Sequence, residues 1–485
     1  MNDNLDQLVS RRSFLRHGSC AALGLAGLTS QLFSMRAMGA MLDGKAFTDY
    51  RALVCVFLFG GNDSGNTLIP FALGEENYDT YASQRTSLAI PQSTLEPHTI
   101  DANGPGSRRF ALHPALDGLR DLYNQGNVAI LSNVGTLLFP MNRQQYRDGT
   151  VPRPPQLFGH NTQQEQWQLS RPDVSDGLGW GGRIADAVQA LGANDSATVS
   201  MNISLSGNSR FLTGRDVAAY AVSSNGPKTL RLNEAGDRTR AEQALLDMIA
   251  IHQDPTHPAS TPMSKVIADV TKRSHDNGQL IDALLQQGTQ VTTPTPDNNL
   301  ARQLAMVARL IEFGRTGLGH QRQIFFVATG GFDTHDNLLE GQAPDQGIHA
   351  GRLREVNDAL VYFWQALGDI NMRDSVTTFT ASDFGRTYRS NGDGSDHGWG
   401  AHHFVMGGNQ VDGGKVYGDF PSILLDGPQD SGSRGTFIPT TSVDAYGFEL
   451  AKWMGVPLSE MDTVFPHIGR FLDVNNPSSH LGILA

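Results

Sequence analysis

Three apolar runs along the chain each end in a polar turn that carries an aspartate. An unbroken apolar run is typical of a strand buried on both faces, as in a parallel sheet. The runs and their acids are residues 52–59 with Asp63, 324–328 with Asp333, and 376–380 with Asp383. Since ligands bind at the carboxyl ends of strands in open α/β sheets, we expect the three acids to meet there.

Between these strands, apolar positions recur with the period of amphipathic helices. The pattern predicts helices at 114–123, 242–252, 264–285, 300–318, 349–367 and 444–454, and further strands at 128–132 and within the segment ATVSMNIS. The alternation predicts an α/β fold, a doubly wound and mostly parallel sheet flanked by helices. We assign residues 41–485 to this domain and the more polar region of about 213–297 to a helical insertion or cap.

Charge and cysteine content disfavour several classes of function. The 485 residues carry a net charge of −12, which speaks against a nucleic-acid partner, because binding phosphates needs a basic surface. Two cysteines, Cys20 and Cys55, cannot cross-link a fold of this size, and they form no redox cluster. Beyond the N-terminal segment, no run of about 18 apolar residues predicts a membrane span.

The N-terminal segment has the layout of an export signal. The stretch SRRSFLR, with Arg11 and Arg12, resembles the twin-arginine export motif, and a weakly apolar run rich in glycine and alanine follows it. We therefore expect residues 1–40 to be a removable signal that directs the protein to the periplasm or out of the cell. The alternative is a basic tail that leads into a buried helix.

Aspartate and histidine crowd together near the predicted strand ends, most densely in the segment SDFGRTYRSNGDGSDHGWGAHHF. Carboxylates and imidazoles bind divalent Zn, Mn, Ca or Fe, and two such ions could activate water for attack on a phosphoryl or sulfuryl group. The candidate ligands are Asp63, Asp333, His335, Asp383, His397, His402 and His403. Each also has an ordinary alternative, since such an aspartate can cap a helix or turn and such a histidine can bond to backbone.

Two further residues are candidates for the reaction itself. Arg386 could bind the oxyanion of a substrate through a bidentate fork. In the segment LFGHNTQQEQWQLS, either Asn161 or Thr162 is predicted to cap a helix over 163–169. The hydroxyl of Thr162 at that helix start is a candidate nucleophile, or a plain cap, and Ser64 is a second candidate.

Motifs spread over most of the chain resemble the bacterial family called domain of unknown function 1501. They include FLFGGNDSGNTLIP, GGFDTHDN, SDFGRTYRSNGDGSDHGWGAHHFVMGG and IPTTSVDAYGFELAKWMGV, and the likeness spans about 51–456. That family is placed by similarity in the alkaline phosphatase and sulfatase superfamily, and its members commonly carry a twin-arginine signal. The resemblance implies a doubly wound α/β core with metals at the strand ends.

The same resemblance implies roles for individual residues. The matching metal-ligand positions are Asp63, Asp333, His335, Asp383 and one of His397, His402 and His403. We favour His397 among the three histidines. Asp383 is followed by Phe384, where the superfamily has another ligand histidine, and the nucleophile motifs of sulfatases and alkaline phosphatases are absent.

Two functions of different classes fit these observations. The first is an exported metal-dependent hydrolase of anionic phosphate or sulfate esters, with a one- or two-metal site. The second is a non-catalytic envelope scaffold or binding protein that keeps a hydrolase-like fold, which the missing nucleophile motifs and Phe384 favour. Genes of the resembled family often lie beside those of another uncharacterised family, number 1800, which implies a protein partner.

Overall fold

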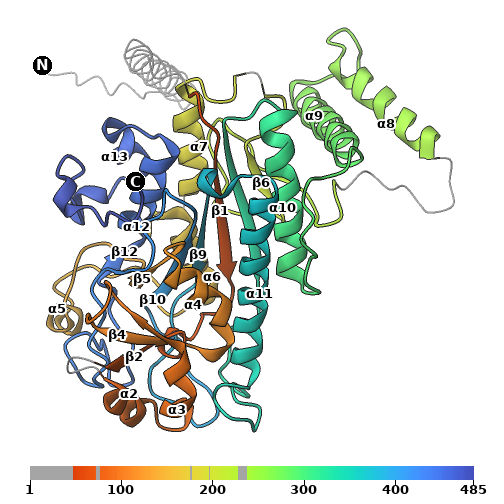
Figure 1. Cartoon of the computed structure of the whole chain (residues 1–485). Coiled ribbons are helices and arrows are strands. Elements are labelled where there is room, and N and C mark those ends of the chain that lie inside the picture. Colours follow the sequence, from red (N-terminus) through yellow and green to blue (C-terminus); the bar gives the residue numbers. More distant parts are fainter. Residues whose placement is uncertain (1–46, 73–76, 175–176, 196, 228–237) are drawn as a thin grey trace, which may run out of the picture.

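The structure is a computed structural model, and it describes residues 47–72, 77–174, 177–195, 197–227 and 238–485 (Figure 1). The predicted export signal, residues 1–40, lies outside the described residues. In the described chain no helix is both long and apolar enough to span a membrane.

A nine-stranded sheet forms the centre of the described chain (Figure 1). Its strands are β1 (Arg51–Leu58), β5 (Val128–Gly135), β6 (Asn202–Ser204), β7 (Tyr220–Ala221), β8 (Arg322–Thr329), β9 (Val376–Ser382), β10 (Ala401–Met406), β11 (Val416–Tyr417) and β12 (Thr441–Ser442). They follow the order β11-β5-β10-β9-β1-β8-β6-β7, with β12 also paired to β5. Only β10 runs antiparallel to its neighbours among these described strands, so the predicted mostly parallel sheet is confirmed.

The central strand β1 is apolar throughout because both of its faces are covered. Val54 and Val56 belong to the hydrophobic core on one face of the sheet, whereas Cys55 and Phe57 belong to the core on the other. Hydrogen bonds to β8 and β9 occupy its two edges. Strands β1, β8 and β9 run parallel, so the turns that follow them lie together at the carboxyl ends of the strands.

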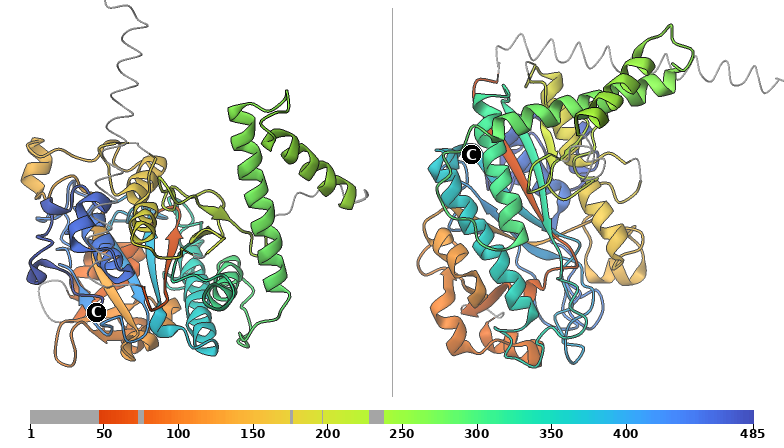
Figure 2. Two further views of the ribbon diagram at one scale, coloured as in Figure 1. Left: turned by 90° about the horizontal axis from the view of Figure 1, so that it is seen from above. Right: turned by 90° about the vertical axis from the view of Figure 1, so that its right-hand side faces the viewer.

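Helices cover both faces of the sheet, as predicted (Figures 1 and 2). The helices whose apolar residues pack in the first core are α4 (Asp117–Asn124), α10 (Asn299–Thr316) and α11 (Ile348–Asp369). Those that pack in the second core are α7 (Trp180–Ala190), α12 (Val443–Met454) and α13 (Met461–Val464). The predicted helices in these regions are confirmed, with their ends shifted by a few residues.

Two smaller units extend from this body. A three-stranded antiparallel sheet of β2 (Leu68–Ala72), β3 (Thr99–Asp101) and β4 (Arg109–Leu112) lies with α2 (Tyr78–Arg85) and α3 (Gln92–Leu95) below the main sheet in Figure 1. Helices α8 (Arg238–Gln253) and α9 (Pro262–Leu285) form a hairpin that projects away from the body (Figure 2). Both helices were predicted, in the region assigned to an insertion or cap.

Strand β10 was not predicted. The sequence pattern treats the whole glycine-rich segment up to Phe404 as a loop, but residues from Ala401 onward pair with β5 and β9. The polar pair His402 and His403 disrupts the apolar run by which the other strands are recognised. All six residues of β10 are buried, so these two imidazoles lie inside the sheet.

Candidate functional site

Four side chains converge beyond the carboxyl ends of β8 and β9. They are His160, Asp333, His335 and His397, and one ligand atom from each lies within 4.8 Å of the others. His160 is the first residue of α6 (His160–Leu169). Asp333 and His335 follow β8, and His397 lies on the loop between β9 and β10. The prediction that acids and histidines meet at this edge therefore holds for Asp333, His335 and His397.

The four groups face one another at short range. The Nε2 atoms of His335 and His397 are 2.6 Å apart, and Oδ1 of Asp333 lies 3.2 Å from the first and 3.5 Å from the second. Oδ2 of Asp333 lies 3.3 Å from Nε2 of His160. Three Nε2 atoms therefore surround one carboxylate.

The Nδ1 atom of each imidazole is held by a group that accepts hydrogen bonds. These acceptors are Asp383 Oδ2 at 2.7 Å from His160, Asp396 Oδ1 at 3.3 Å from His335, and the Phe158 carbonyl at 2.5 Å from His397. Such a partner places the ring hydrogen on Nδ1, so the lone pair of each neutral ring is on Nε2. Metal-binding histidines have this arrangement, with the other ring nitrogen donating to a carboxylate or backbone carbonyl.

The charges of the site also suit a cation. Burial holds the pKa of His397 below its usual value, so that ring is neutral near pH 7. Burial would raise the pKa of Asp333, but the hydrogen bond and charge of Arg386 outweigh it, so the pKa is lowered and the group is ionised. The hydrogen bond from His160 to Asp383 raises the pKa of His160, so a proton and a metal ion compete for its Nε2.

The donor set fits a divalent transition metal. Nε2 of His160 is buried, with Oδ2 of Asp333 at 3.3 Å, and the lone pairs of His335 and His397 oppose each other unless a proton or a cation lies between them. Three nitrogens and one carboxylate oxygen are typical of zinc and related ions, whereas calcium binds oxygen ligands.

Asp383 and Asp63 are buried and do not belong to this group of four. Asp383 is buried, and its Oδ2 also accepts hydrogen bonds from Gln164 at 2.8 Å and from the Gly60 backbone at 3.2 Å. Asp63 is fully buried and pairs with Arg85 at 2.5 Å. Both acids keep one buried oxygen, Oδ1, without a hydrogen-bond partner. Asp383 thus positions His160, and Arg85 supplies a positive charge to Asp63.

His402 and His403 lie outside the group of four because β10 buries them. Nδ1 of His402 accepts a hydrogen bond from the Asn133 backbone at 3.0 Å, and its ring stacks on Phe420. This bond uses the only lone pair of the neutral ring. Burial lowers the pKa of His402 and of His403 to about 3, so both remain neutral.

Arg386 holds Asp333 in place through hydrogen bonds to that side chain and to the backbone around it. One of its terminal nitrogens donates to Asp333 at 2.8 Å and to the Gly60 carbonyl at 3.1 Å, and the other donates to the Ser395 carbonyl. Its side chain is 0% exposed. The structure therefore places this residue, predicted to contact substrate, as a support for Asp333.

The predicted helix start at Asn161 or Thr162 is wrong. Helix α6 begins at His160, with Gly159 as the N-cap residue. The hydroxyl of Thr162 donates to the side chain of Gln156 at 2.8 Å. The sequence favoured a polar side chain as the N-cap, but the N-cap residue is Gly159, which makes no side-chain hydrogen bond to the helix.

Glycines bring the two ligand loops together. The loop between β9 and β10 folds back on itself through backbone hydrogen bonds of Gly385 with Trp399 and Gly398. A Cβ atom on Gly385 would lie 2.2 Å from the Gly400 oxygen, and one on Gly394 would lie 2.3 Å from the Thr334 oxygen. Only glycine fits at such distances, so the glycines allow His397 to reach His335.

Sequence reasoning missed His160, Gln164 and Asp396. His160 stands alone among polar residues at a helix start, and neither period nor spacing marks it as a ligand. Asp396 directly precedes His397, which is a weak signal for a carboxylate near the site. The role of Asp396, holding His335, depends on two loops whose meeting no local pattern encodes.

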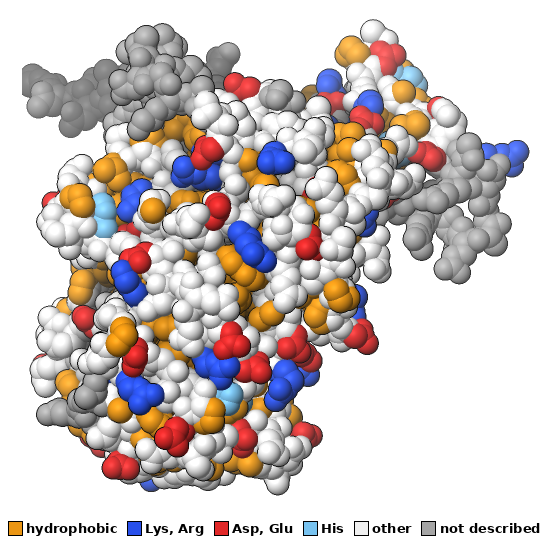
Figure 3. Space-filling view, in the orientation of Figure 1, with side chains coloured by type: hydrophobic (Ala, Val, Ile, Leu, Met, Phe, Trp, Pro, Cys, Tyr) orange, Lys and Arg blue, Asp and Glu red, His pale blue; other side chains and the backbone are white. Residues whose placement is uncertain are grey.

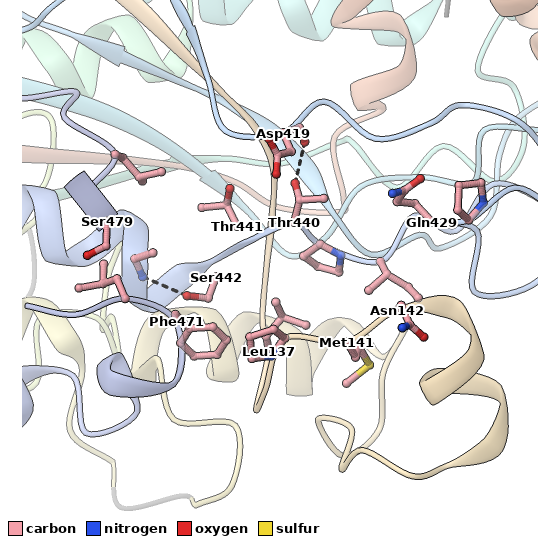
Figure 4. A pocket seen from close by; sticks show the side chains of 17 residues that line it. Leu137, Met141, Asn142, Asp419, Gln429, Thr440, Thr441, Ser442, Phe471 and Ser479 are labelled. Atoms are coloured by element: carbon pink, nitrogen blue, oxygen red, sulfur yellow. Dashed lines mark hydrogen bonds between the residues drawn. The ribbon is translucent and has the colours of Figure 1, made fainter. Parts of the chain in front are cut away.

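A separate cavity of about 390 Å³ lies away from this site (Figure 4). Apolar groups such as Leu137 and Phe471 line it together with neutral hydroxyl groups of Thr440 and Ser442. None of the four converging residues borders it.

The chain is similar to several solved structures. They include Ps i-CgsB in complex with k-i-k-neocarrahexaose (11% identity, 88% of this chain, 78% of that chain, TM-score 0.34), the PsFucS1 sulfatase from Pseudoalteromonas sp. (9%, 88%, 71%, 0.32) and a mutant of the alkaline phosphatase PafA (10%, 71%, 64%, 0.27). These similarities are too low to bear on the chemistry of this chain.

The curated proteins give no significant match. One family model, described as "Protein of unknown function (DUF1501)", matches residues 50–430, which include all four converging residues. Because this match covers most of the 485 residues, the chain belongs to the DUF1501 family.

Proposed function

We propose that this protein is a metal-dependent hydrolase of phosphate or sulfate esters. Its metal ion would be held by His160, Asp333, His335 and His397. The observation that carries the proposal is the convergence of three Nε2 lone pairs on one carboxylate, with every Nδ1 fixed by an acceptor. A bound divalent ion supplies Lewis acidity, which polarises an ester oxygen and lowers the pKa of water.

Solvent access supports binding of a substrate at this site. The side chain of Asp333 is 46% exposed and that of His335 is 40% exposed, whereas Asp383 behind them is fully buried. The ligand group therefore has one open side and one closed side. Water and an ester group can reach the open side, and Asp383 with Gln164 keeps His160 oriented from the closed side.

Two partly exposed guanidinium groups near the open side, each also paired with a carboxylate, could bind an anionic ester. Arg434 pairs with Asp396, the acid that holds His335, and its side chain is 45% exposed. Arg352 is partly exposed and pairs with Glu355 at 2.8 Å, and its side chain lies against Gly331, which is close in sequence to Asp333. Guanidinium groups bind phosphate and sulfate oxygens well.

Water is the nucleophile that the site supports best. The hydroxyl of Thr162 is bound to Gln156. The hydroxyl of Ser64 is buried and accepts a hydrogen bond from the His402 backbone at 2.9 Å. Neither hydroxyl belongs to the converging group.

The test is turnover of aryl phosphate and aryl sulfate esters by protein loaded with zinc, manganese or iron. We expect turnover by the wild type, a fall of at least about 100-fold in His397→Ala, and no change in His257→Ala, a control at an exposed histidine. Stoichiometric metal binding without turnover of any ester would reject the hydrolase while keeping the metal site.

A structural metal in a non-catalytic envelope protein is the second candidate. The specific observation in its favour is that four protein donors complete a tetrahedral shell, as in structural zinc sites, whereas catalytic sites keep a position open. In that case metal removal would lower the melting temperature, no ester would turn over, and the protein would co-purify with an envelope partner.

The location outside the cytoplasm is part of the same proposal. It rests on the twin-arginine pattern at Arg11 and Arg12. We expect Arg11→Lys/Arg12→Lys to retain the protein in the cytoplasm, with Arg16→Lys as the control. Unchanged export of the double variant, measured by cell fractionation, would argue against this route.

A further inference from the structure

Most of the large hydrophobic side chains that are exposed in the described chain lie on the hairpin of α8 and α9, residues 238–285, which we call the arm. Ten large hydrophobic side chains are exposed among the described residues, and six of them lie on the arm. These six are Met248, Ile251, Met263, Val266, Ile267 and Val270. A concentration of this kind marks a surface that binds another macromolecule.

Four of the six form a single stripe on α9. Met263, Val266, Ile267 and Val270 follow the spacing i, i+3, i+4 and i+7, which places them on one helix face. Their exposed fractions run from 52% to 70%. Met248 and Ile251, one turn apart, add a shorter apolar stripe on α8.

The stripe lies at the end of the arm that points away from the body. Apolar side chains near the other end of α9, such as Ile281 and Leu284, pack in the main hydrophobic core. The loop between α8 and α9 is at the far end, beside Met263 (Figures 1 and 2). Hydrophobic side chains are visible over this projecting part in Figure 3. The described part of the chain therefore leaves the stripe uncovered.

We propose that the stripe is a two-fold interface between two copies of this chain. The arm holds five basic and six acidic residues, whereas the whole chain has a net charge of −12. Two arms can approach without the repulsion that acidic surfaces would impose. The stripe is also bordered by both signs of charge one turn apart, Lys265 and Asp269, which lie 2.8 Å from each other.

An antiparallel pairing of two α9 helices satisfies both the apolar and the charged positions. Met263 of one copy then faces Val270 of the other, and Val266 faces Ile267. Lys265 of each copy lies near Asp269 of the second. Such an interface is isologous, since the same patch serves both partners. A strongly basic or acidic partner would lack this charge match.

The first test is the mass of the full chain, without its predicted signal, by sedimentation and light scattering. We expect a dimer for the wild type and a monomer for Ile267→Glu. Leu424→Glu and Leu458→Glu, at exposed leucines off the arm, should leave the dimer intact. A monomeric wild type at about 100 µM, or a dimer that survives Ile267→Glu, would overturn the proposal.

A charge exchange distinguishes self-association from binding to something else. Lys265→Glu should weaken the dimer about 3- to 10-fold, and Lys265→Glu/Asp269→Lys should restore it, because the swapped pair again matches itself. Ile267→Cys should form a disulfide-linked dimer on oxidation, since Cys55 is buried. The proposed two-fold interface would be contradicted if the double variant failed to regain dimerisation. Binding of the monomer to neutral lipid vesicles through the stripe would also contradict it. These results do not depend on the metal site.

Discussion

The loop at 383–400 and strand β10 are adjacent in sequence, and their histidines have opposite surroundings. His397, on the loop, donates from Nδ1 to a backbone carbonyl and turns a free Nε2 lone pair toward the converging group. His402, on the strand, uses its Nδ1 lone pair to accept a backbone hydrogen bond. The partner of Nδ1, rather than the density of histidines, decides which ring can bind a metal.

The strand-end acids show the same contrast. Asp333 is half-exposed and is held in place by Arg386 and the three histidines. Asp63 occupies a similar position after β1, but it is fully buried against Arg85. A carboxylate beyond a strand end can thus face the site or be neutralised inside the protein.

The largest effect is expected from removing two loop ligands. His335→Ala/His397→Ala should abolish stoichiometric binding of zinc, because it deletes two of three nitrogen donors. The measurement is metal content by mass spectrometry after purification without chelator. His402→Gln, on the neighbouring strand, should keep the full metal content. Equal loss of metal in both variants would mean that the loop histidines and His402 on β10 do not differ in metal binding.

The next effect concerns strand β10 and the free energy of unfolding at acid pH. Since burial lowers the pKa of His402 to about 3, its contribution to stability is present above the unfolded value near 6.5 and is lost as the pH falls toward 3. The loss at pH 4 amounts to about 3 kcal/mol for this ring. His402→Phe should therefore show a weaker fall in the free energy of unfolding between pH 7 and pH 4, measured with urea.

That experiment has an internal check. At pH 7 the phenylalanine variant leaves the Asn133 N–H without its acceptor, which costs about 1–3 kcal/mol. The expected signature is thus a lower stability at pH 7 with a shallower pH dependence. A variant with the same slope as the wild type would show that His402 titrates normally.

A smaller effect is expected from the acid behind His160. Asp383→Asn keeps the size of the side chain but weakens the hydrogen bond that fixes the His160 ring. Loss of such an outer partner typically lowers metal affinity about 10- to 100-fold. Competition with a zinc chelator measures this change. An unchanged affinity would contradict the role of Asp383 in positioning His160. Asp297→Asn, at a fully exposed aspartate, serves as the control.

Much of the fold could be predicted because its signals are local. The unbroken apolar run of β1 reflects burial on both faces, and the long helices show the period of one buried stripe. Strand β10 escaped prediction because His402 and His403 break the apolar run, and only pairing with β5 and β9 makes that segment a strand.

The site could be predicted in part for the same reason. Asp333, His335 and His397 lie where the strand ends and the resemblance indicated. His160 could not be predicted, since it reaches the group from a separate helix. The pairing of Asp63 with Arg85 could not be predicted either, because the two residues are 22 positions apart in sequence. Contacts of this kind depend on the packing of whole elements rather than on spacing.

X-ray absorption spectroscopy at the absorption edge of the bound metal identifies the metal's ligand atoms directly. For zinc-loaded wild-type protein, we predict scattering from three imidazole nitrogens at about 2.0–2.1 Å with carboxylate oxygen completing the shell. A shell dominated by oxygen, as Asp63 and Asp383 would provide, or the absence of any bound ion in folded protein, would contradict the proposed centre.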